Sequence, residues 1–278
     1  MLEWDDHLPP HLENIWEKFK SNLHKLEEIE IPRYVLINNA VKYELHGFSD
    51  ASEKAYAAVI YVRSINSNGD IQINLITSKS KVAPLKKLTL PRLELCGAHL
   101  LAKLMSVLIS GTNLSVNKTL CWCDLTIVLA WLNSPSNRWK TFIANRVAQI
   151  HEFIPNATWH YVKSSDNPAD CASRGIGTSE LKTHNLWWNG PPFLDKYEYI
   201  FHEPTCTEDN QLEIKREEKK LASLLTQTKE GPPTFGLLQK FSSLSKLKRV
   251  TAYCFRFIEN CKKTAERKKS SISHCFRT

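Results

Sequence analysis

The chain has 278 residues, 42% of them hydrophobic and 24% charged, which suffices for one sizeable core with flanking elements or for two small domains. It has no apolar run of about 18 residues, and its acidic first residues lack the basic and apolar regions of a signal peptide. Neither a membrane span nor secretion is therefore expected.

The net charge of +8 is unevenly distributed along the chain. Residues 240–278 carry 11 Lys and Arg against 2 acidic residues, and residues 44–194 carry 15 against 10. Residues 1–43 and 195–239 each have a net charge of −3. A basic balance favours polyanionic partners, although a solvated charged tail is the alternative for residues 240–278 taken alone.

Eight cysteines occur without the C-x2-C spacing of a zinc knuckle. They stand at positions 96, 121, 123, 171, 206, 254, 261 and 275. In a chain of this length without a signal peptide, buried reduced thiols are the usual state, so we expect an intracellular location.

The first 79 residues predict one helix and then three strands. Apolar residues between positions 11 and 29 recur at the spacing of an amphipathic helix. Residues 43–49, 55–62 and 71–77 have the composition or alternation of strands, with a turn signal at 66–70. Their short connections predict an antiparallel meander, and the first strand is followed by Asp50.

A basic loop over residues 79–87 leads to a helix predicted over residues 93–108, with Pro91 at its start. Glu94 lies on the face of this helix that also carries Gly97 and Leu101. A carboxylate on the core side of a helix is costly unless a cation or a hydrogen-bond donor meets it. The alternative is that Glu94 only favours the helix N-terminus.

Asp124 stands between a predicted strand at 119–123 and a predicted helix at 126–132. Open α/β sheets place their sites at this position, where a strand ends and the chain turns into a helix. The alternative is that Asp124 is simply the N-cap of the helix.

Asp170 follows a predicted helix at 142–153 and a last predicted strand at 158–162. Asn167 as N-cap and Pro168 as the first helical residue form a coherent helix start, in which Asp170 could merely complement the helix dipole. Taken together, the four carboxylates follow the order Asp, Glu, Asp, Asp on a β-β-β-α-β-α-β-α frame.

Five stretches carry a family resemblance, at residues 46–52 (His-Gly-Phe-Ser-Asp-Ala-Ser), 82–95, 138–142, 166–174 and 186–188. In these stretches the chain resembles the ribonuclease H domain of a Bel/Pao-type LTR retrotransposon polyprotein. The resemblance is strong over about residues 40–194. It implies an α/β fold of the ribonuclease H-like class, a five-stranded mixed sheet with three antiparallel and then two parallel strands, flanked by helices and followed by a helical C-terminal extension.

The resemblance also implies a division of the chain into three parts. Residues 1–42 would be an N-terminal connection segment that follows a reverse transcriptase, and residues 43–194 the ribonuclease H-like domain. Residues 195–278 would be a linker and basic helical tail that leads toward an integrase. The implied partners are an RNA–DNA hybrid and the reverse transcriptase and integrase parts of a parent polyprotein, in the cytoplasm, a retroelement particle or the nucleus.

The implied activity is hydrolysis of the RNA backbone in an RNA–DNA hybrid with two Mg²⁺ ions, Mn²⁺ being the alternative cofactor. Asp50 would bind both ions, Glu94 and Asp124 would hold one, and Asp170 would hold the other. Four carboxylates this close would repel one another without metal. The candidate phosphate contacts are Lys79, Lys81, Lys86, Lys87 and Arg92.

Some features depart from the family pattern or leave other functions open. Leu125 replaces the small polar residue that usually follows the third carboxylate, and no residue can be assigned as the mobile histidine of cellular ribonucleases H, since His160 lies in a predicted strand.

An inactive or repurposed nucleic-acid-binding relic of the same fold is the main alternative. An integrase core would carry its glutamate last, and an aspartic peptidase would need Asp-Ser-Gly or Asp-Thr-Gly, which Asp50-Ala51-Ser52 does not fit.

Overall fold

The structure of the chain is a computed structural model that describes residues 7, 9–112, 114–198, 201, 207–219 and 243–274, with the side chains of the last helix described up to residue 262. The chain forms two compact units, residues 1–220 and 221–278. The second unit contains the helix α10 (Leu244–His274). The predicted three-part division of the chain stays a prediction.

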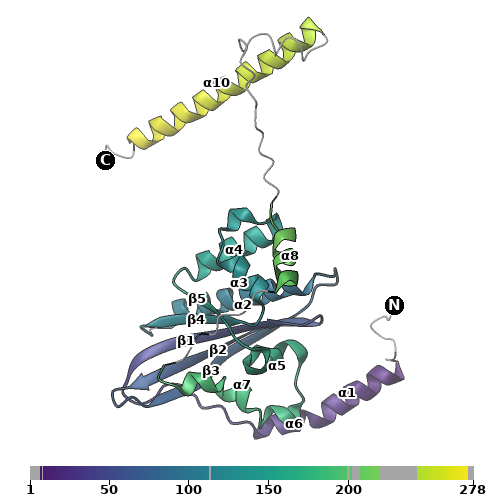
Figure 1. The fold of residues 1–278 in the computed structure, drawn as a ribbon, viewed down its shortest axis with the longest axis vertical. Helices are drawn as coiled ribbons and strands as arrows, with labels where there is room; N and C mark the ends of the chain where they lie inside the picture. The colour runs from purple at the N-terminus through teal and green to yellow at the C-terminus, as the bar shows by residue number, and fades with distance from the viewer. Residues whose placement is uncertain are drawn as a thin grey trace. The chain divides into compact units, whose positions relative to one another are not determined.

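A five-stranded mixed sheet forms the centre of the first unit (Figure 1). Its spatial order is β3-β2-β1-β4-β5, with β1 antiparallel to β2, β2 antiparallel to β3, β1 parallel to β4, and β4 parallel to β5. The predicted fold class is therefore confirmed. The strands are β1 (Ala40–Ala51), β2 (Ala55–Asn66), β3 (Ile71–Val82), β4 (Lys118–Cys123) and β5 (Thr158–Tyr161).

The first three strands are longer than their apolar patterns predict. Each has 12 residues, because pairing with the neighbouring strand extends beyond the apolar stretch that predicted the strand. The basic segment 79–87 was predicted to be a loop, but its first residues belong to β3, where Lys81 pairs with Tyr56 of β2. Only the part of this segment beyond Val82 connects β3 to the next helix.

Helices cover both faces of the sheet (Figure 1). One face packs against α2 (Leu90–Gly111) and α3 (Thr126–Leu132), and α4 (Thr141–Phe153) packs on these two helices. These helices and this face of the sheet contain the larger core cluster. The other face carries α5 (Ala169–Arg174), α7 (Asn185–Asn189) and the 3-10 turn η4 (Pro192–Asp195), around a smaller cluster centred on Phe48, Tyr61 and Trp122. Short turns named η2 (Ser136–Arg138), η3 (Ser164–Asp166) and α6 (Thr178–Leu181) complete the connections.

The helix predicted over residues 11–29 is present as α1 (Pro10–Asn22), which continues as the 3-10 helix η1 (Leu23–Glu28). No residue of either element is buried. The apolar stripe of this helix therefore faces solvent in the described chain, with Ile15, Trp16 and Phe19 each about half exposed or more.

By length and composition alone, α2 could cross a membrane. The same helix packs against β1, β2 and α4, and ten of its residues are buried, including Glu94. This burial is what the core helix of a globular domain shows, because such a helix is apolar nearly all round.

Part of the segment predicted to be linker and tail packs on the first unit. The helix α8 (Glu208–Arg216) contacts α3, where Asn210 Nδ2 donates to Thr126 Oγ1 at 2.8 Å. Beyond α8 the backbone pairs with the chain around η2, since Lys140 N donates to Glu217 O at 2.8 Å and Lys219 N donates to Arg138 O at 2.9 Å.

Candidate active site

Asp50 is the penultimate residue of β1, the central strand of the sheet. Its side chain is 2% exposed, and its Oδ2 accepts a hydrogen bond from Ser173 Oγ of α5. Burial raises the pKa of Asp50 to about 7; the hydrogen bond from Ser173 opposes this shift, and the carboxylates of Asp124 and Asp170 add to it. The central strand thus delivers a carboxyl group into a buried acidic environment.

Glu94 lies in the first turns of α2 and points toward the end of β1. It is 4% exposed, and its Oε1 accepts a hydrogen bond from the backbone N–H of Ala51 at 3.1 Å. Its Oε2 is buried and has no hydrogen-bond partner in the described part of the chain. Burial, followed by the charges of Asp124 and Asp50, raises the pKa of Glu94 to about 10.

Gly97 allows α2 to lie this close to β1. A Cβ atom at this position would stand 3.1 Å from the carbonyl oxygen of Asp50, which is tighter than an ordinary van der Waals contact. Gly97 follows Glu94 by about one helical turn, so both residues face β1. The glycine therefore helps to set the distance over which Glu94 reaches Ala51.

Asp124 follows the last residue of β4, next to β1 in the sheet. It is half-buried, and its Oδ2 accepts a hydrogen bond from Ser164 Oγ at 2.6 Å. Burial raises the pKa of Asp124, and the carboxylate of Asp170 raises it further, whereas the Ser164 bond lowers it. Because β1 and β4 run parallel, their carboxyl ends bring Asp50 and Asp124 to the same edge of the sheet.

Asp170 lies in the first turn of α5 and forms an ion pair with Arg174 one turn further along. Buried Asn167 fixes the start of this helix: its Nδ2 donates to Ser49 O at 3.0 Å, and its Oδ1 accepts from Ala169 N at 3.2 Å. The helix begins at Ala169 with Pro168 as N-cap, one residue later than predicted. The bond to β1 holds Asp170 on the side of the sheet where Asp50 lies.

The four carboxylates thus come from four different elements, and their charges interact at one end of the sheet. Ligand atoms of Glu94, Cys123 and Asp124 all lie within 4.8 Å of one another. Carboxylate oxygens are the ligands that Mg²⁺ prefers, and the buried unpaired Oε2 of Glu94 lacks a partner that a cation could supply. The residues present therefore fit a divalent cation, while the role of each one stays a prediction.

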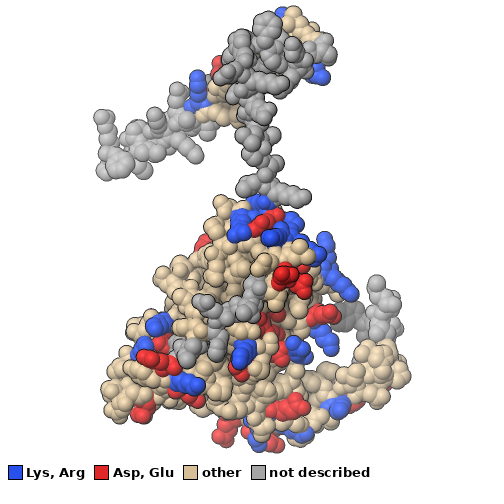
Figure 2. All heavy atoms as spheres, viewed as in Figure 1, with Lys and Arg blue, Asp and Glu red and all other residues tan. Residues whose placement is uncertain are grey.

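The predicted phosphate contacts differ in their surroundings. Lys79 and Lys81 are exposed on β3, and Lys86 and Lys87 are exposed in the connection to α2. Arg92, in contrast, donates from Nε and Nη2 to Glu217 Oε1 at 3.0 and 2.7 Å. In Figure 2, Lys and Arg side chains gather along one margin of the first unit, with acidic side chains beside them.

Several residues at this site were not predicted from the sequence. Ser173 and Arg174 belong to one of the stretches that carry the resemblance, but no sequence pattern pairs them with Asp50 and Asp170. Ser164 was not predicted to bind Asp124, and Asn167 was predicted as an N-cap but not as the residue that binds Ser49 of β1. The sequence did contain a signal that Cys123 lies near the site. It directly precedes Asp124, and because side chains alternate along a strand, it lies on the face opposite to that of Trp122.

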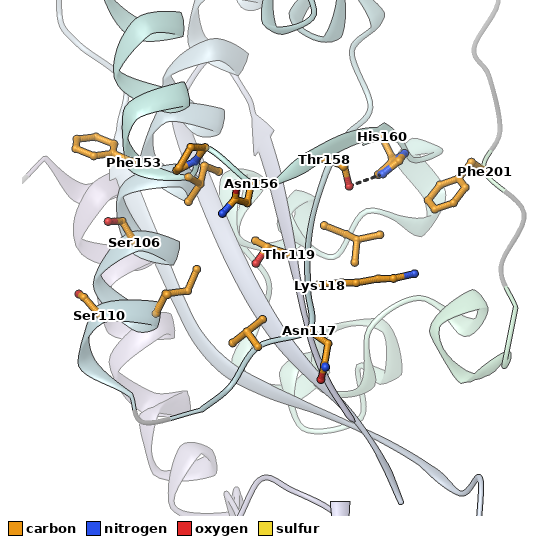
Figure 3. Close-up of a pocket in the computed structure, with 16 residues that line it drawn as sticks. Ser106, Ser110, Asn117, Lys118, Thr119, Phe153, Asn156, Thr158, His160 and Phe201 are labelled. Atoms are coloured by element: carbon orange, nitrogen blue, oxygen red, sulfur yellow. Dashed lines mark hydrogen bonds between the residues drawn. The ribbon is translucent and has the colours of Figure 1, made fainter. Parts of the chain in front are cut away.

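A separate cavity of about 770 Å³ lies at the opposite end of the parallel strands (Figure 3). Its walls include Lys118 and Thr119 at the start of β4, Thr158 at the start of β5, and Ser106 and Ser110 in the second half of α2. Its lining residues include neither Asp nor Glu. Because the carboxylates stand at the other ends of these strands, this cavity is distinct from the acidic cluster.

The first 125 residues match the sequence family described as Pao retrotransposon-like RNaseH-like domain. No curated protein is significantly similar in sequence to the chain.

Similar solved structures include RNase H1 from the halophilic archaeon Halobacterium salinarum NRC-1, with 10% identity, a TM-score of 0.31, and coverage of 51% of this chain and 98% of that one. LC11-RNase H1, isolated from compost and solved with an RNA/DNA hybrid, has 13% identity and a TM-score of 0.32 over 45% of this chain and 88% of its own. The protease-reverse transcriptase of prototype foamy virus has 12% identity and a TM-score of 0.31 over 57% and 23% of the two chains. Likenesses this weak carry no inference about substrate or activity.

Proposed function

We propose that this chain, a ribonuclease H-like domain by the family match of its first 125 residues and the strand order of its sheet, hydrolyses the RNA strand of an RNA–DNA hybrid. The reaction would use two divalent cations, Mg²⁺ in preference and Mn²⁺ as the alternative. Asp50, Glu94, Asp124 and Asp170 would be the residues that hold them.

The observation that carries the proposal is the convergence of these carboxylates at one end of the sheet. Asp50 and Glu94 are each at least nine-tenths buried, and burial together with the charges of neighbouring carboxylates raises the pKa of both groups. A cluster of this kind costs folding free energy unless its charge is compensated. A function that requires bound cations explains why a buried sheet end would contain it.

Divalent cations at this place would activate a water molecule and stabilise the leaving oxygen of a phosphodiester. The chain's own residues hold the ligands in place. Ser173 and Ser164 donate hydrogen bonds to Asp50 and Asp124, and Arg174 pairs with Asp170. Each partner restricts its carboxylate to one orientation, which supports a preformed site.

Substrate contacts would come from the exposed lysines at the end of β3 and in the connection to α2. Lys79, Lys81, Lys86 and Lys87 precede Glu94 in the chain and can reach phosphates as flexible point charges. Recognition would depend on the shape of the hybrid and on 2′-hydroxyl groups, with little reading of base sequence. Arg92 would join them only by leaving Glu217.

The test is cleavage of an end-labelled RNA–DNA hybrid with Mg²⁺ or Mn²⁺, in which the wild-type chain is compared with Asp50→Asn. We expect the wild type to cut the RNA strand and the variant to lose about 100-fold or more of the rate, because a ligand of the cations is removed. Asp70→Asn is the matched control. Asp70 lies in the exposed turn between β2 and β3 and should be replaced without effect.

Two outcomes would contradict the proposal. Undiminished cutting by Asp50→Asn would place the activity elsewhere, either at another site or in a contaminating nuclease. A folded wild type that binds the hybrid but does not cut it with either cation would favour the alternative of a nucleic-acid-binding relic of the same fold.

A further inference from the structure

The thiol of Cys123 lies among the carboxylates of the proposed active site. Its sulfur and ligand oxygens of Glu94 and Asp124 are all within 4.8 Å of one another. Cys123 is fully buried at the end of β4 and belongs to the core cluster on the α2 side of the sheet. The alternation of side chains along β4 therefore directs this sulfur toward the helix that carries Glu94.

A polar atom close to this sulfur lacks a hydrogen-bond partner, which is a second observation that points to a bound ion. Glu94 Oε2 is buried without a hydrogen-bond partner in the described part of the chain, although Glu94 is only 4% exposed. The sulfur itself contacts only backbone in the bonds described, accepting from Leu125 N at 3.4 Å. One thiol and two carboxylates thus surround a place where a polar atom lacks its partner.

Sulfur among these ligands changes which ions the cluster can hold. Mg²⁺ takes oxygen ligands, whereas Zn²⁺ and similar soft ions bind thiolate, carboxylate and water together. Ligand atoms around a tetrahedral ion of this kind lie roughly 3.5 Å apart. Since the three ligand atoms all lie within 4.8 Å of one another, they would need to close by at most about 1.3 Å.

We propose that Glu94, Cys123 and Asp124 form a site for one thiophilic divalent cation, Zn²⁺ or Cd²⁺, that shares two ligands with the proposed Mg²⁺ site and competes with it. The cation binds the Cys123 thiolate, and the thiol proton passes to solvent. Binding depends on these side chains alone. The competition with Mg²⁺ rests on the proposed function.

Cys121 offers a matched control within the same strand. It is buried on the same face of the sheet as Cys123, but it is not one of the residues whose ligand atoms cluster with Glu94 and Asp124. A thiol that is only part of the core would behave in the same way at both positions.

The experiment uses the full chain with the cysteines at 206, 254, 261 and 275 replaced by serine, which removes the thiols of the C-terminal region. This reference protein is stripped of metal and titrated with Cd²⁺ while the sulfur-to-cadmium charge-transfer absorption in the ultraviolet is recorded. We expect a band that saturates at one ion per chain. It should be absent from Cys123→Ser and retained by Cys121→Ser.

A second variant, which retains the thiol, keeps the proposal testable if Cys123→Ser fails to fold. Glu94→Gln should weaken Cd²⁺ binding about tenfold or more and leave the band visible at saturation. Circular dichroism of each variant reports whether it is folded. No band in the folded reference protein, or an equal band in Cys123→Ser, would overturn the proposal.

Cleavage of the RNA–DNA hybrid by the reference protein separates this inference from the proposed function. A charge-transfer band without cleavage in Mg²⁺ would support the thiol site and count against the nuclease. Cleavage in Mg²⁺ without a band would support the nuclease and overturn only the thiol site. With both present, added Cd²⁺ should inhibit cleavage, and excess Mg²⁺ should restore it.

Discussion

Buried polar residues of β1 have compensating partners at one end of the strand and repelling neighbours at the other. Near its start, Glu44 accepts a hydrogen bond from Arg63 at 2.7 Å, and both side chains are 1% exposed. Burial alone would raise the pKa of Glu44, but hydrogen bonds from His46 and Lys42 and the charge of Arg63 hold it well below its usual range. Near the end of β1, Asp50 has carboxylates as neighbours instead, which is the arrangement expected of a functional site.

His46 is the residue whose charge state should affect stability near neutral pH. It is fully buried, its Nδ1 accepts from Trp122 Nε1 at 3.3 Å, and its Nε2 lies 3.6 Å from Glu44. Burial lowers the pKa of His46 below 6.5 in spite of the Glu44 carboxylate, which raises it, and the charges of Arg63 and Lys118 lower it further. The neutral imidazole is therefore the form that the folded chain holds.

We expect His46 to make the protein less stable as the pH falls below about 6.5. Below this pH the His46 imidazole binds a proton in the unfolded chain but not in the folded chain. Its contribution therefore decreases the free energy of unfolding by at most about 1.4 kcal/mol per pH unit. Urea unfolding between neutral and mildly acidic pH measures this slope. Asp50 and Glu94, whose raised pKa values favour the folded chain as the pH falls, contribute in the same way to the wild type and to His46→Gln. His46→Gln, which can still accept from Trp122, should therefore lose less stability, or gain more, than the wild type as the pH falls.

His11→Gln is the control for this prediction, because His11 is exposed on α1. It should leave the slope as it is in the wild type. If the stabilities of His46→Gln and the wild type change in parallel as the pH falls, the imidazole of His46 is already protonated in the folded chain and the prediction is wrong.

Among the elements, α2 and α5 hold the site together from opposite faces of the sheet. Gly47 and Gly97 allow α2 to approach β1, since a Cβ atom at Gly47 would stand 2.5 Å from Leu101 Cδ1. The helix α5 is tied to β1 through Asn167 and through Ser52 Oγ, which donates to Ser173 O at 2.8 Å. The carboxylates of Glu94 and Asp170 are therefore placed by helix–sheet packing and by side-chain bonds to strand ends.

The segment that contains α8 is held by charged contacts with elements far away in the sequence. Glu217 binds Arg92 at the start of α2, and Glu218 binds Arg138, while the backbone of Trp139 pairs with that of Glu218. The Arg92–Glu217 pair is partly buried, which makes it stronger than a surface ion pair. We therefore expect the segment from 207 to 219 to stabilise the first unit.

Glu217→Ala should lower the free energy of unfolding by about 1–2 kcal/mol, because Arg92 loses a charged acceptor in a half-buried place. The matched control is Glu213→Ala on α8, whose partner Arg216 is one turn away and mostly exposed. Its effect should stay within about 0.5 kcal/mol. Urea unfolding of both variants measures these changes in the free energy of unfolding. Equal changes would mean that the Arg92–Glu217 pair contributes little to stability.

At the scale of the whole molecule, the chain separates into a unit with the sheet and a unit with α10. The second unit, residues 221–278, contains the whole of the strongly basic segment 240–278. If the chain binds nucleic acid as proposed, a cationic segment in the same chain would add contacts to phosphates that do not depend on base sequence. The intracellular location and the polyprotein partners stay predictions.

We expect the basic residues after 220 to steepen the salt dependence of binding to an RNA–DNA hybrid. Each tail cation that contacts a phosphate should add about 1 to the slope of log affinity against log salt concentration. Fluorescence anisotropy with chelator present, to prevent cleavage, compares the full chain with a chain that ends at residue 220. Identical slopes would show that the tail is a solvated charged segment without a role in binding.

A second comparison tests the lysines near the site by the same measurement. Replacement of Lys79, Lys81, Lys86 and Lys87 by glutamine should reduce the slope in both chains by a similar amount, because these residues belong to the first unit. The tail and the lysines near the site would then act as independent contributors.

The sequence by itself determined the order and type of the main elements, because the spacing of apolar residues is a local property of the chain. It also determined that four carboxylates stand at strand ends and helix starts in the order Asp50, Glu94, Asp124, Asp170. It did not determine the ends of the strands, where ladder pairing extends β3 through Lys79 and Lys81. Propensity reports on each strand alone, whereas the ladder depends on its neighbour.

Only the tertiary structure decided which side chains meet the carboxylates. The bonds from Ser173 to Asp50 and from Asn167 to Ser49 join residues more than 100 positions apart, as does the pair of Arg92 with Glu217. No periodicity along the chain encodes such contacts, because they depend on how helices pack on the sheet. The position of the Cys123 sulfur beside Glu94 has the same origin, since it requires both the direction of β4 and the close approach of α2.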